Sequence, residues 1–246
     1  MDNEINFSKL FHQYTKSFHK TIPADSSLWP DEWKTIYYKT YPRLPRIKLN
    51  HQEKKFDLFE ALKKRSSQRE FSGGKISNEK LSLLLKYSCG ITRRDSSGDG
   101  RRPQPSGGAR FPLETYCLII RPDKNLKPGV FHYNVPEHCL EKLWEKEFSK
   151  EDIEQLARYK FVHDASLIIF LTAVFWRTQN KYGERGYRFI LQESGHIGQN
   201  IYLVSETLGL KCCALGGFRI SDEQIEKLLD IDGVTESLVY TLAVGK

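Results

Sequence analysis

The sequence predicts an α+β fold in which helices cover the faces of a mixed β-sheet. Three observations predict it. Short apolar runs, the longest at 165–176, are typical of buried strands. Other segments, above all 187–208, repeat apolar residues every three or four positions, as amphipathic helices do. With 246 residues, 39% of them hydrophobic and 12% aromatic, the chain can bury the core of one large domain or two small ones.

The first fifty residues are rich in aromatic residues and proline. Phe11, Tyr14 and Phe18 recur at steps of three and four, which predicts an apolar helical face. Prolines between residues 28 and 49 exclude a continuous helix there, so we expect an extended segment that wraps a surface. We therefore divide the chain into an aromatic, proline-rich arm, residues 1–50, and a main domain, residues 51–246.

The first part of the main domain is predicted to be helical and then irregular. An amphipathic helix is expected at 54–65, and a second at 77–90, where Ser77 is a suitable N-cap and Gly90 ends the helix. A loop rich in Gly, Ser, Pro and Arg follows at 91–112. Structureless loops of this length inside a compact domain are usually functional or disordered.

The second half of the domain supplies most of the predicted sheet. The expected strands are 113–121, 128–135, 138–144, 166–175, 210–215 and 237–244, the second and third forming a hairpin. The expected helices are 149–161, 187–208 and 221–231, the last with a capping box. We expect a loop at 180–190, NKYGERGYRFI, between the 166–175 strand and the long helix.

Charge and cysteine content restrict the classes of function. The net charge of +7 favours anionic partners, but no basic run is long enough for a nucleic-acid-binding arm. The five cysteines are odd in number and form no CxxC pair, so we expect a reducing cytoplasm, no disulfide framework and no metal site. The N-terminus lacks the pattern of a signal peptide, and no apolar stretch is long enough to span a membrane.

Three clusters of polar and small residues are candidate ligand sites. The first follows the 54–65 helix and consists of Arg65, Ser66, Ser67 and Arg69. Two guanidiniums and two hydroxyls this close together suit a phosphate group. A solvated basic end of a helix, favoured by the helix dipole, has the same composition, and spacing does not distinguish the two.

The other two clusters contain paired glycines. In PSGGAR, residues 105–110, the glycines let the backbone approach a ligand, or they simply shape a loop. In LGG, residues 215–217, they follow a strand, which suits main-chain contact with a flat ring system or an ordinary turn. The P-loop, Rossmann and GxSxG hydrolase motifs are absent.

The stretch 180–190 is the fourth candidate. It concentrates titratable side chains, beginning with Lys181 and Tyr182, and Gly183 and Gly186 lie between them. A solvated turn and an active site both have this composition. Polar groups where a strand ends and a helix begins often face ligands.

The order of these motifs resembles the nitroreductase superfamily, and in particular its SagB/ThcOx type, the azoline dehydrogenases of ribosomal-peptide biosynthesis. The ordered set spans roughly residues 50–246: RSSQREF, KLSLLLKYSCGIT, RPQPSGGARFPLETY, PGVFHYNVPEHCLE, KYGERGYRFILQESGHIGQNIYLVSETLGL, LGGF and VYTLAVG. The resemblance implies a nitroreductase-like fold and a homodimer with FMN at the subunit interface.

The resemblance also assigns roles to residues. Those matching the segment that holds the FMN phosphate and the polar edge of the flavin are Arg65, Ser67 and Arg69. Those matching the segment that reaches the flavin from the other subunit are Pro105, Ser106 and Gly107. Those matching the backbone that meets flavin N5 are Leu215, Gly216 and Gly217. The pair matching the catalytic Lys-Tyr motif is Lys181 and Tyr182.

The function implied is oxidation of thiazolines or oxazolines to azoles in a precursor peptide, beside a cyclodehydratase partner. Lys181 would take the proton and flavin N5 the hydride. An exposed lysine, with a pKa near 10.4, needs desolvation to act as a base at neutral pH. The alternatives are an NAD(P)H-dependent FMN nitroreductase or quinone reductase, another flavin oxidoreductase, and a basic binding module without activity.

Overall fold

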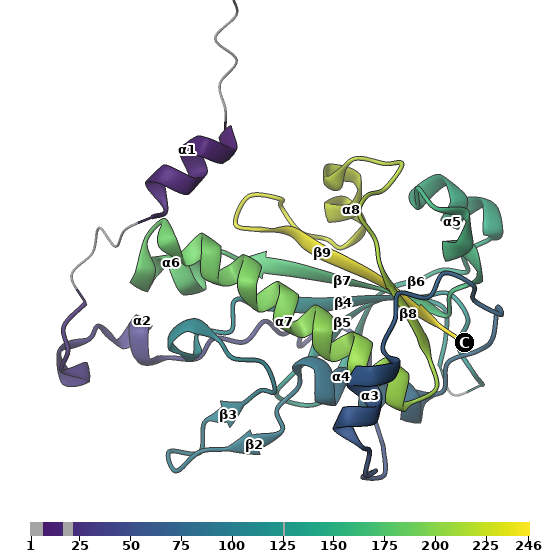
Figure 1. The fold of residues 1–246 in the computed structure, drawn as a ribbon, viewed down its shortest axis with the longest axis horizontal. Helices are drawn as coiled ribbons and strands as arrows, with labels where there is room; N and C mark the ends of the chain where they lie inside the picture. Colours follow the sequence, from purple (N-terminus) through teal and green to yellow (C-terminus); the bar gives the residue numbers. More distant parts are fainter. Residues whose placement is uncertain (1–6, 17–21, 125) are drawn as a thin grey trace, which may run out of the picture.

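The computed structural model describes residues 7–16, 22–124 and 126–246, so the expected helical position of Phe18 lies outside the described residues. Its centre is a seven-stranded sheet in the order β1-β6-β5-β4-β7-β9-β8 (Figure 1). The strands are β1 Arg46–Lys48, β4 Leu113–Ile119, β5 Gly129–Asn134, β6 Cys139–Glu145, β7 Leu167–Val174, β8 Lys211–Ala214 and β9 Glu236–Gly245. All the strands predicted from the sequence are therefore present.

Every strand pairing in this sheet is antiparallel, so the prediction of a mixed sheet was wrong. The β4-β5-β6 meander is antiparallel because short connections join its strands. The helical connection from β7 to β8 does join two strands of the same direction, as such crossovers do. However, β9 lies between them and is antiparallel to both.

Helices cover both faces of the sheet. The described α-helices are α1 Phe7–Tyr14, α2 Asp31–Lys34, α3 Leu58–Lys64, α4 Asn78–Cys89, α5 Lys150–Leu156, α6 Trp176–Tyr182, α7 Arg185–Thr207 and α8 Asp222–Leu228. One apolar core lies between the sheet and the α4-α7 pair, and the other lies under α5 and α8 (Figure 1). Two faces of one sheet are thus buried, which explains why β7 is almost entirely apolar and why every residue of β4 is buried.

The predicted caps are confirmed where the structure describes them. Ser77 accepts a hydrogen bond from the N–H of Lys80, and Gly90 is the C-cap of α4. Ser221 and Gln224 form the capping box of α8. The predicted loop at 91–112 contains a small hairpin, β2 Arg93–Arg94 with β3 Gly100–Arg101.

The expectation of a loop at 180–190 was wrong. Residues 176–182 form α6, and only Gly183 and Glu184 separate it from α7. Arg177 and Lys181 of α6 are one helical turn apart, and both are buried. Gly183, with φ of +57°, makes the sharp break between the two helices.

The arm contributes a strand to the main sheet. β1 pairs with β6, so that Ile47 lies opposite Leu140. The preceding segment runs beneath α6 through the short helix α2 (Figure 1). Five cysteines are free and buried. No helix among the described residues is long and apolar enough to cross a membrane.

Candidate active site

Lys181 lies at the end of α6 and is only 2% exposed. Its Nζ is 3.3 Å from the centroid of the Trp29 ring, 5.5 Å from that of Tyr182 and 5.9 Å from that of Trp33. Burial lowers the pKa of Lys181 below its ordinary value, and the nearby guanidinium of Arg110 lowers it further. A lysine in these surroundings gives up its proton more readily than one in water.

The glycine turn of the 105–110 cluster meets this lysine. A Cβ on Gly108, whose φ is +63°, would lie 2.5 Å from Oη of Tyr182 and 3.4 Å from Nζ of Lys181. A Cβ on Gly107 would lie 3.2 Å from the ring of Phe189. The structure therefore brings two of the predicted clusters together, with Pro105 exposed and Gly107 half-buried beside them.

Ser106 fixes the base of this turn. Its hydroxyl accepts a hydrogen bond from the N–H of Phe111 at 2.8 Å. Its other neighbour is Glu193 of α7, which is buried. Burial raises the pKa of Glu193 to about 7. The hydrogen bonds from Ser106 and Gln104 and the charge of Arg102 lower this pKa, but their effect is smaller than that of burial. Sequence reasoning missed Glu193, because one carboxylate on an amphipathic helix carries no distinctive signal.

The first and third predicted clusters meet at Tyr202 of α7. Its hydroxyl contacts Oγ of Ser67 at 2.9 Å and accepts a hydrogen bond from the N–H of Ala214 at 2.7 Å. The guanidinium of Arg65 lies 5.5 Å from the centre of its ring. Ser67 and Arg69 are exposed, and Arg65 is half-buried. One side chain thus links the arginine-serine segment to the end of β8.

The glycines after β8 leave their backbone open. Leu215 is buried, and its N–H donates to the carbonyl of Thr241 at 2.9 Å. Among the described residues, the N–H groups of Gly216 and Gly217 have no hydrogen-bond acceptor. A Cβ on Gly217 would meet nothing within 4 Å. These two N–H groups are therefore free to bind a ligand.

The two pairs of clusters contact opposite ends of α7. Gly107 packs against Phe189, and Ser67 packs against Tyr202, thirteen residues further along the helix. At 1.5 Å per residue, these contacts are about 20 Å apart along the helix axis. In one chain the predicted residues therefore form two separate groups, one with Lys181 and one with Arg65.

A buried polar network supports α6 from the sheet. Nη1 of Arg177 lies 2.6 Å from Oε1 of Glu114, and His132 lies 3.0 Å from Glu114 on one side and from Glu141 on the other. Burial opposes ionisation of Glu114, but Arg177 and His132 lower its pKa to about 2. Lys39 extends the network to Glu236, because its backbone N–H donates to Glu114 and its Nζ donates to Glu236. Sequence reasoning missed this network, because its members come from several strands, from α6 and from the segment before β1.

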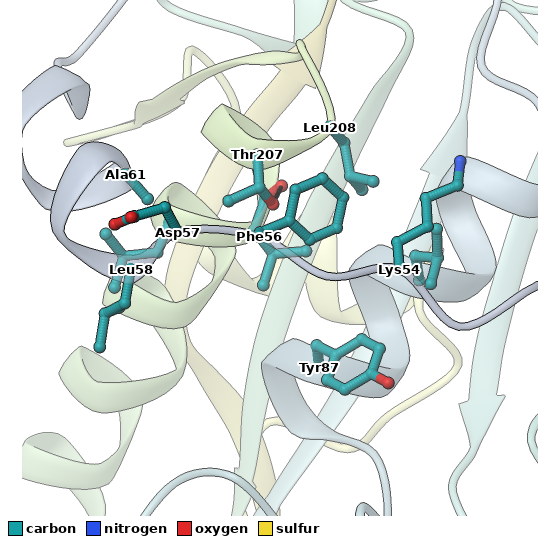
Figure 2. Close-up of a pocket in the computed structure, with 11 residues that line it drawn as sticks. Lys54, Phe56, Asp57, Leu58, Ala61, Tyr87, Thr207 and Leu208 are labelled. Atoms are coloured by element: carbon teal, nitrogen blue, oxygen red, sulfur yellow. Dashed lines mark hydrogen bonds between the residues drawn. The ribbon is translucent and has the colours of Figure 1, made fainter.

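Figure 2 shows a separate groove between α3, α4 and α7. Its lining is mostly apolar and includes Phe56, Leu58 and Leu208. It contains none of the predicted cofactor-binding or catalytic residues. In addition, Phe59 is 80% exposed, so the apolar face of α3 is not buried within the chain.

Comparison with known proteins settles the family. Residues 62–246 match the Nitroreductase family. The chain is a member of the nitroreductase family. The matched range contains all of the cofactor-binding and catalytic residues predicted from the sequence, but it leaves out Trp29 and the rest of the arm.

Three curated proteins resemble this nitroreductase-family chain. The nitroreductase-type protein MJ1384 of Methanocaldococcus jannaschii is 31% identical over 71% of the chain and 84% of its own length. The microcin B17-processing protein McbC of Escherichia coli is 34% identical over 55% of the chain and 50% of its own length. The trifolitoxin-processing protein TfxB of Rhizobium leguminosarum is 27% identical over 70% of the chain and 48% of its own length. The similarity spans about half the length of McbC and TfxB.

Solved structures confirm the nitroreductase-like fold. A nitroreductase-type protein of Anabaena variabilis has a TM-score of 0.74 at 24% identity, over 97% of this chain and 46% of that one. A chain of the E. coli microcin synthetase McbBCD complex, with truncated pro-MccB17 bound, has a TM-score of 0.62 at 21% identity. The match covers 98% of this chain and 91% of that one. A nitroreductase-type protein of Exiguobacterium sibiricum in complex with FMN has a TM-score of 0.52 at 16% identity. The match covers 79% of this chain and 90% of that one.

Proposed function

We propose that this protein is an FMN-dependent dehydrogenase that oxidises azolines to azoles in a ribosomally made peptide. The observation that carries the proposal is the contact of Lys181 and Tyr182 with the glycine turn at 107–108. A buried lysine with a lowered pKa is a suitable base for removing a proton from carbon. The relatives McbC and TfxB are peptide-processing proteins, which supports a peptide substrate.

The residues around Tyr202 fit FMN. The exposed Arg69 and half-buried Arg65 provide charged donors for a phosphate, and Ser67 provides a hydroxyl. The unoccupied N–H groups of Gly216 and Gly217 suit the polar edge of a flavin. When bound, the flavin would supply the hydride acceptor. A nitroreductase-type structure with the same fold contains FMN, which supports this choice.

We further propose that two copies of the chain complete each site. The Lys181 group and the Arg65 group are about 20 Å apart along α7, so one flavin at Arg65 would meet the 105–107 segment of a partner. Two features of the single chain support this arrangement. The apolar face of α3 is exposed, and a Cβ on Gly195 of α7 would meet nothing within 4 Å. A second helix could therefore approach α7 closely at Gly195.

In this reaction Lys181 removes the proton from Cα of the azoline ring, and Nζ then carries that proton. Tyr182, whose hydroxyl lies against Gly108, orients the ring. The peptide would be supplied by a cyclodehydratase in the cytoplasm. The fold is also that of a chain in the McbBCD synthetase complex, which supports a similar partner.

The second candidate is an NAD(P)H-dependent reductase of nitroaromatics or quinones, which the similarity to MJ1384 favours. One experiment distinguishes the two. The purified protein with bound flavin is incubated with an azoline peptide in air, and separately with NADH and a nitroaromatic compound. A loss of about 2 Da per ring, the mass of two hydrogens, supports the dehydrogenase. Rapid NADH consumption with no change in the peptide's mass would overturn it.

A further inference from the structure

The segment before α2 covers the proposed base. The indole of Trp29 lies over Nζ of Lys181, at 3.3 Å from the ring centroid, and Lys181 is almost fully buried. Trp29 itself is half-buried, so its outer face is in contact with solvent. A base covered in this way cannot reach a carbon atom of a peptide until the indole moves.

The covering segment is anchored directly on its C-terminal side. Arg110 donates to the carbonyls of Glu32, Trp33 and Thr35 at 2.5 to 2.7 Å, and to that of Arg177 at 3.0 Å. These four bonds fix α2 against α6. They lie on the C-terminal side of Trp29, where a hinge would be needed.

On the N-terminal side, the nearest described anchors lie outside the segment, where Arg185 and Arg188 of α7 donate to the end of α1. In the part of the chain that the structure describes, residues 22–31 form hydrogen bonds and ion pairs only within residues 22–35. For example, Nε1 of Trp29 donates to the carbonyl of Pro23 at 2.7 Å. The segment 22–31 is therefore a self-contained flap, and no hydrogen bond or ion pair between described residues ties it to the sheet or to α6.

The contact between Trp29 and Lys181 also affects the charge of the lysine. A cation over an indole face is stabilised, so Trp29 favours the protonated form of Lys181. Burial and Arg110 favour the neutral form. When the indole moves away, one stabiliser of the cation is lost and a flat surface beside Nζ becomes free. Both changes favour proton abstraction from a flat ring bound in the place of the indole.

We propose that Trp29 is a lid over the base. It caps Lys181 in this structure, and the flap 22–31 swings about α2 when the five-membered ring of an azoline peptide takes its place. The identity of the incoming ring rests on the proposed function, whereas the lid itself does not. Trp29 thus controls which substrates reach Lys181.

The first test measures access to Lys181 without any turnover. The flavin-loaded protein is treated with a dilute acetylating reagent, and the rate of modification at Lys181 is followed by peptide mass spectrometry. Trp29→Ala should increase this rate about 10-fold or more, and Trp29→Phe should give an intermediate rate. Trp176→Ala is the matched control, because Trp176 is on α6 but half exposed and packs on Tyr37. Equal rates in Trp29→Ala and the wild type would overturn the lid.

The second test identifies what opens the lid. Trp33, Trp144 and Trp176 are replaced by Phe, so that fluorescence reports on Trp29 alone. An azole peptide, which is already oxidised, is then added, and its binding is followed separately by anisotropy of a label on the peptide. A red shift of the Trp29 emission on binding is expected. Binding without a shift contradicts the lid, whereas absence of binding contradicts the proposed substrate and leaves the acetylation result to decide on the lid.

Discussion

Arg177 of α6 is ion-paired with Glu114 of β4, with Nη1 and Oε1 2.6 Å apart and both side chains almost fully buried. This pair joins the helix that carries Lys181 to the central sheet. Arg177 lies one helical turn before Lys181, so the position of the proposed base depends on the pair. The site is thus supported by a buried charge network rather than by apolar packing alone.

Arg177→Met should lower the free energy of unfolding by about 3–5 kcal/mol, because it removes one partner of a buried ion pair. Urea unfolding followed by circular dichroism measures this change. The double variant Arg177→Met with Glu114→Gln should be more stable than Arg177→Met, since the uncompensated carboxylate is gone. If Arg177→Met alone were as stable as the wild type, the network would not support α6.

His132 should make stability depend on pH. Burial opposes its charge, but hydrogen bonds to Glu114 and Glu141 raise its pKa above the ordinary 6.5. The folded state therefore binds this proton more tightly than the unfolded state. The resulting stability is fully present below pH 6.5 and is lost as the pH rises through the raised pKa of the folded protein.

His132→Asn should remove this part of the pH dependence and lower stability most at pH 6. Unfolding free energies measured by urea titration between pH 6 and pH 9 test it. His196→Asn is the control, because His196 is exposed on α7. An unchanged slope in His132→Asn would show that His132 does not carry its proton in the folded protein.

Lys181→Ala should reduce kcat for azoline oxidation by about 100- to 10,000-fold, the usual contribution of a general base, while flavin content stays the same. In the wild type, kcat should rise with pH, because the neutral amine is the active form, and its apparent pKa should lie below 10.5. Stopped-flow reduction of the flavin by the peptide measures both quantities. Lys227→Ala, on the exposed face of α8, should behave as the wild type.

Arg65→Ala should weaken FMN binding about 10- to 100-fold, the effect of losing one charge-assisted hydrogen bond to phosphate. Equilibrium dialysis with FMN measures the dissociation constant. Arg94→Ala removes an exposed arginine of β2 and provides the control for net charge. If both variants bound FMN equally well, Arg65 would have no role in holding the phosphate.

The sequence predicted the elements of the fold better than their arrangement. Apolar runs located all the strands of the main domain, but no local pattern indicates that β9 lies between β7 and β8. Likewise, a loop was expected at 180–190, and no local pattern indicates that Arg177 and Lys181 lie on one helix and are buried. Periodicity reports the environment of apolar residues and cannot recognise a charge that is paired inside the protein.

The same limit applies to the site. The ordered motifs located the segments around Arg65, Gly107 and Lys181, because each carries an unusual local composition. The contact between Trp29 and Lys181 joins residues 152 positions apart (181 − 29), and only the fold brings them together. A tryptophan in an arm that is rich in aromatic residues and proline gives no sign of such a contact.

Gly108→Ala should reduce turnover much more than it reduces stability. A Cβ at this position would lie 2.5 Å from Oη of Tyr182, so the tyrosine or the turn must shift. Gly98 is a matched control, because its φ is also positive, at +87°, but a Cβ there would meet nothing within 4 Å. Both substitutions should cost about 1 kcal/mol of unfolding free energy through backbone strain. Only Gly108→Ala should also lower kcat, so equal activity of the two variants would exclude a catalytic role for the contact between Gly108 and Tyr182.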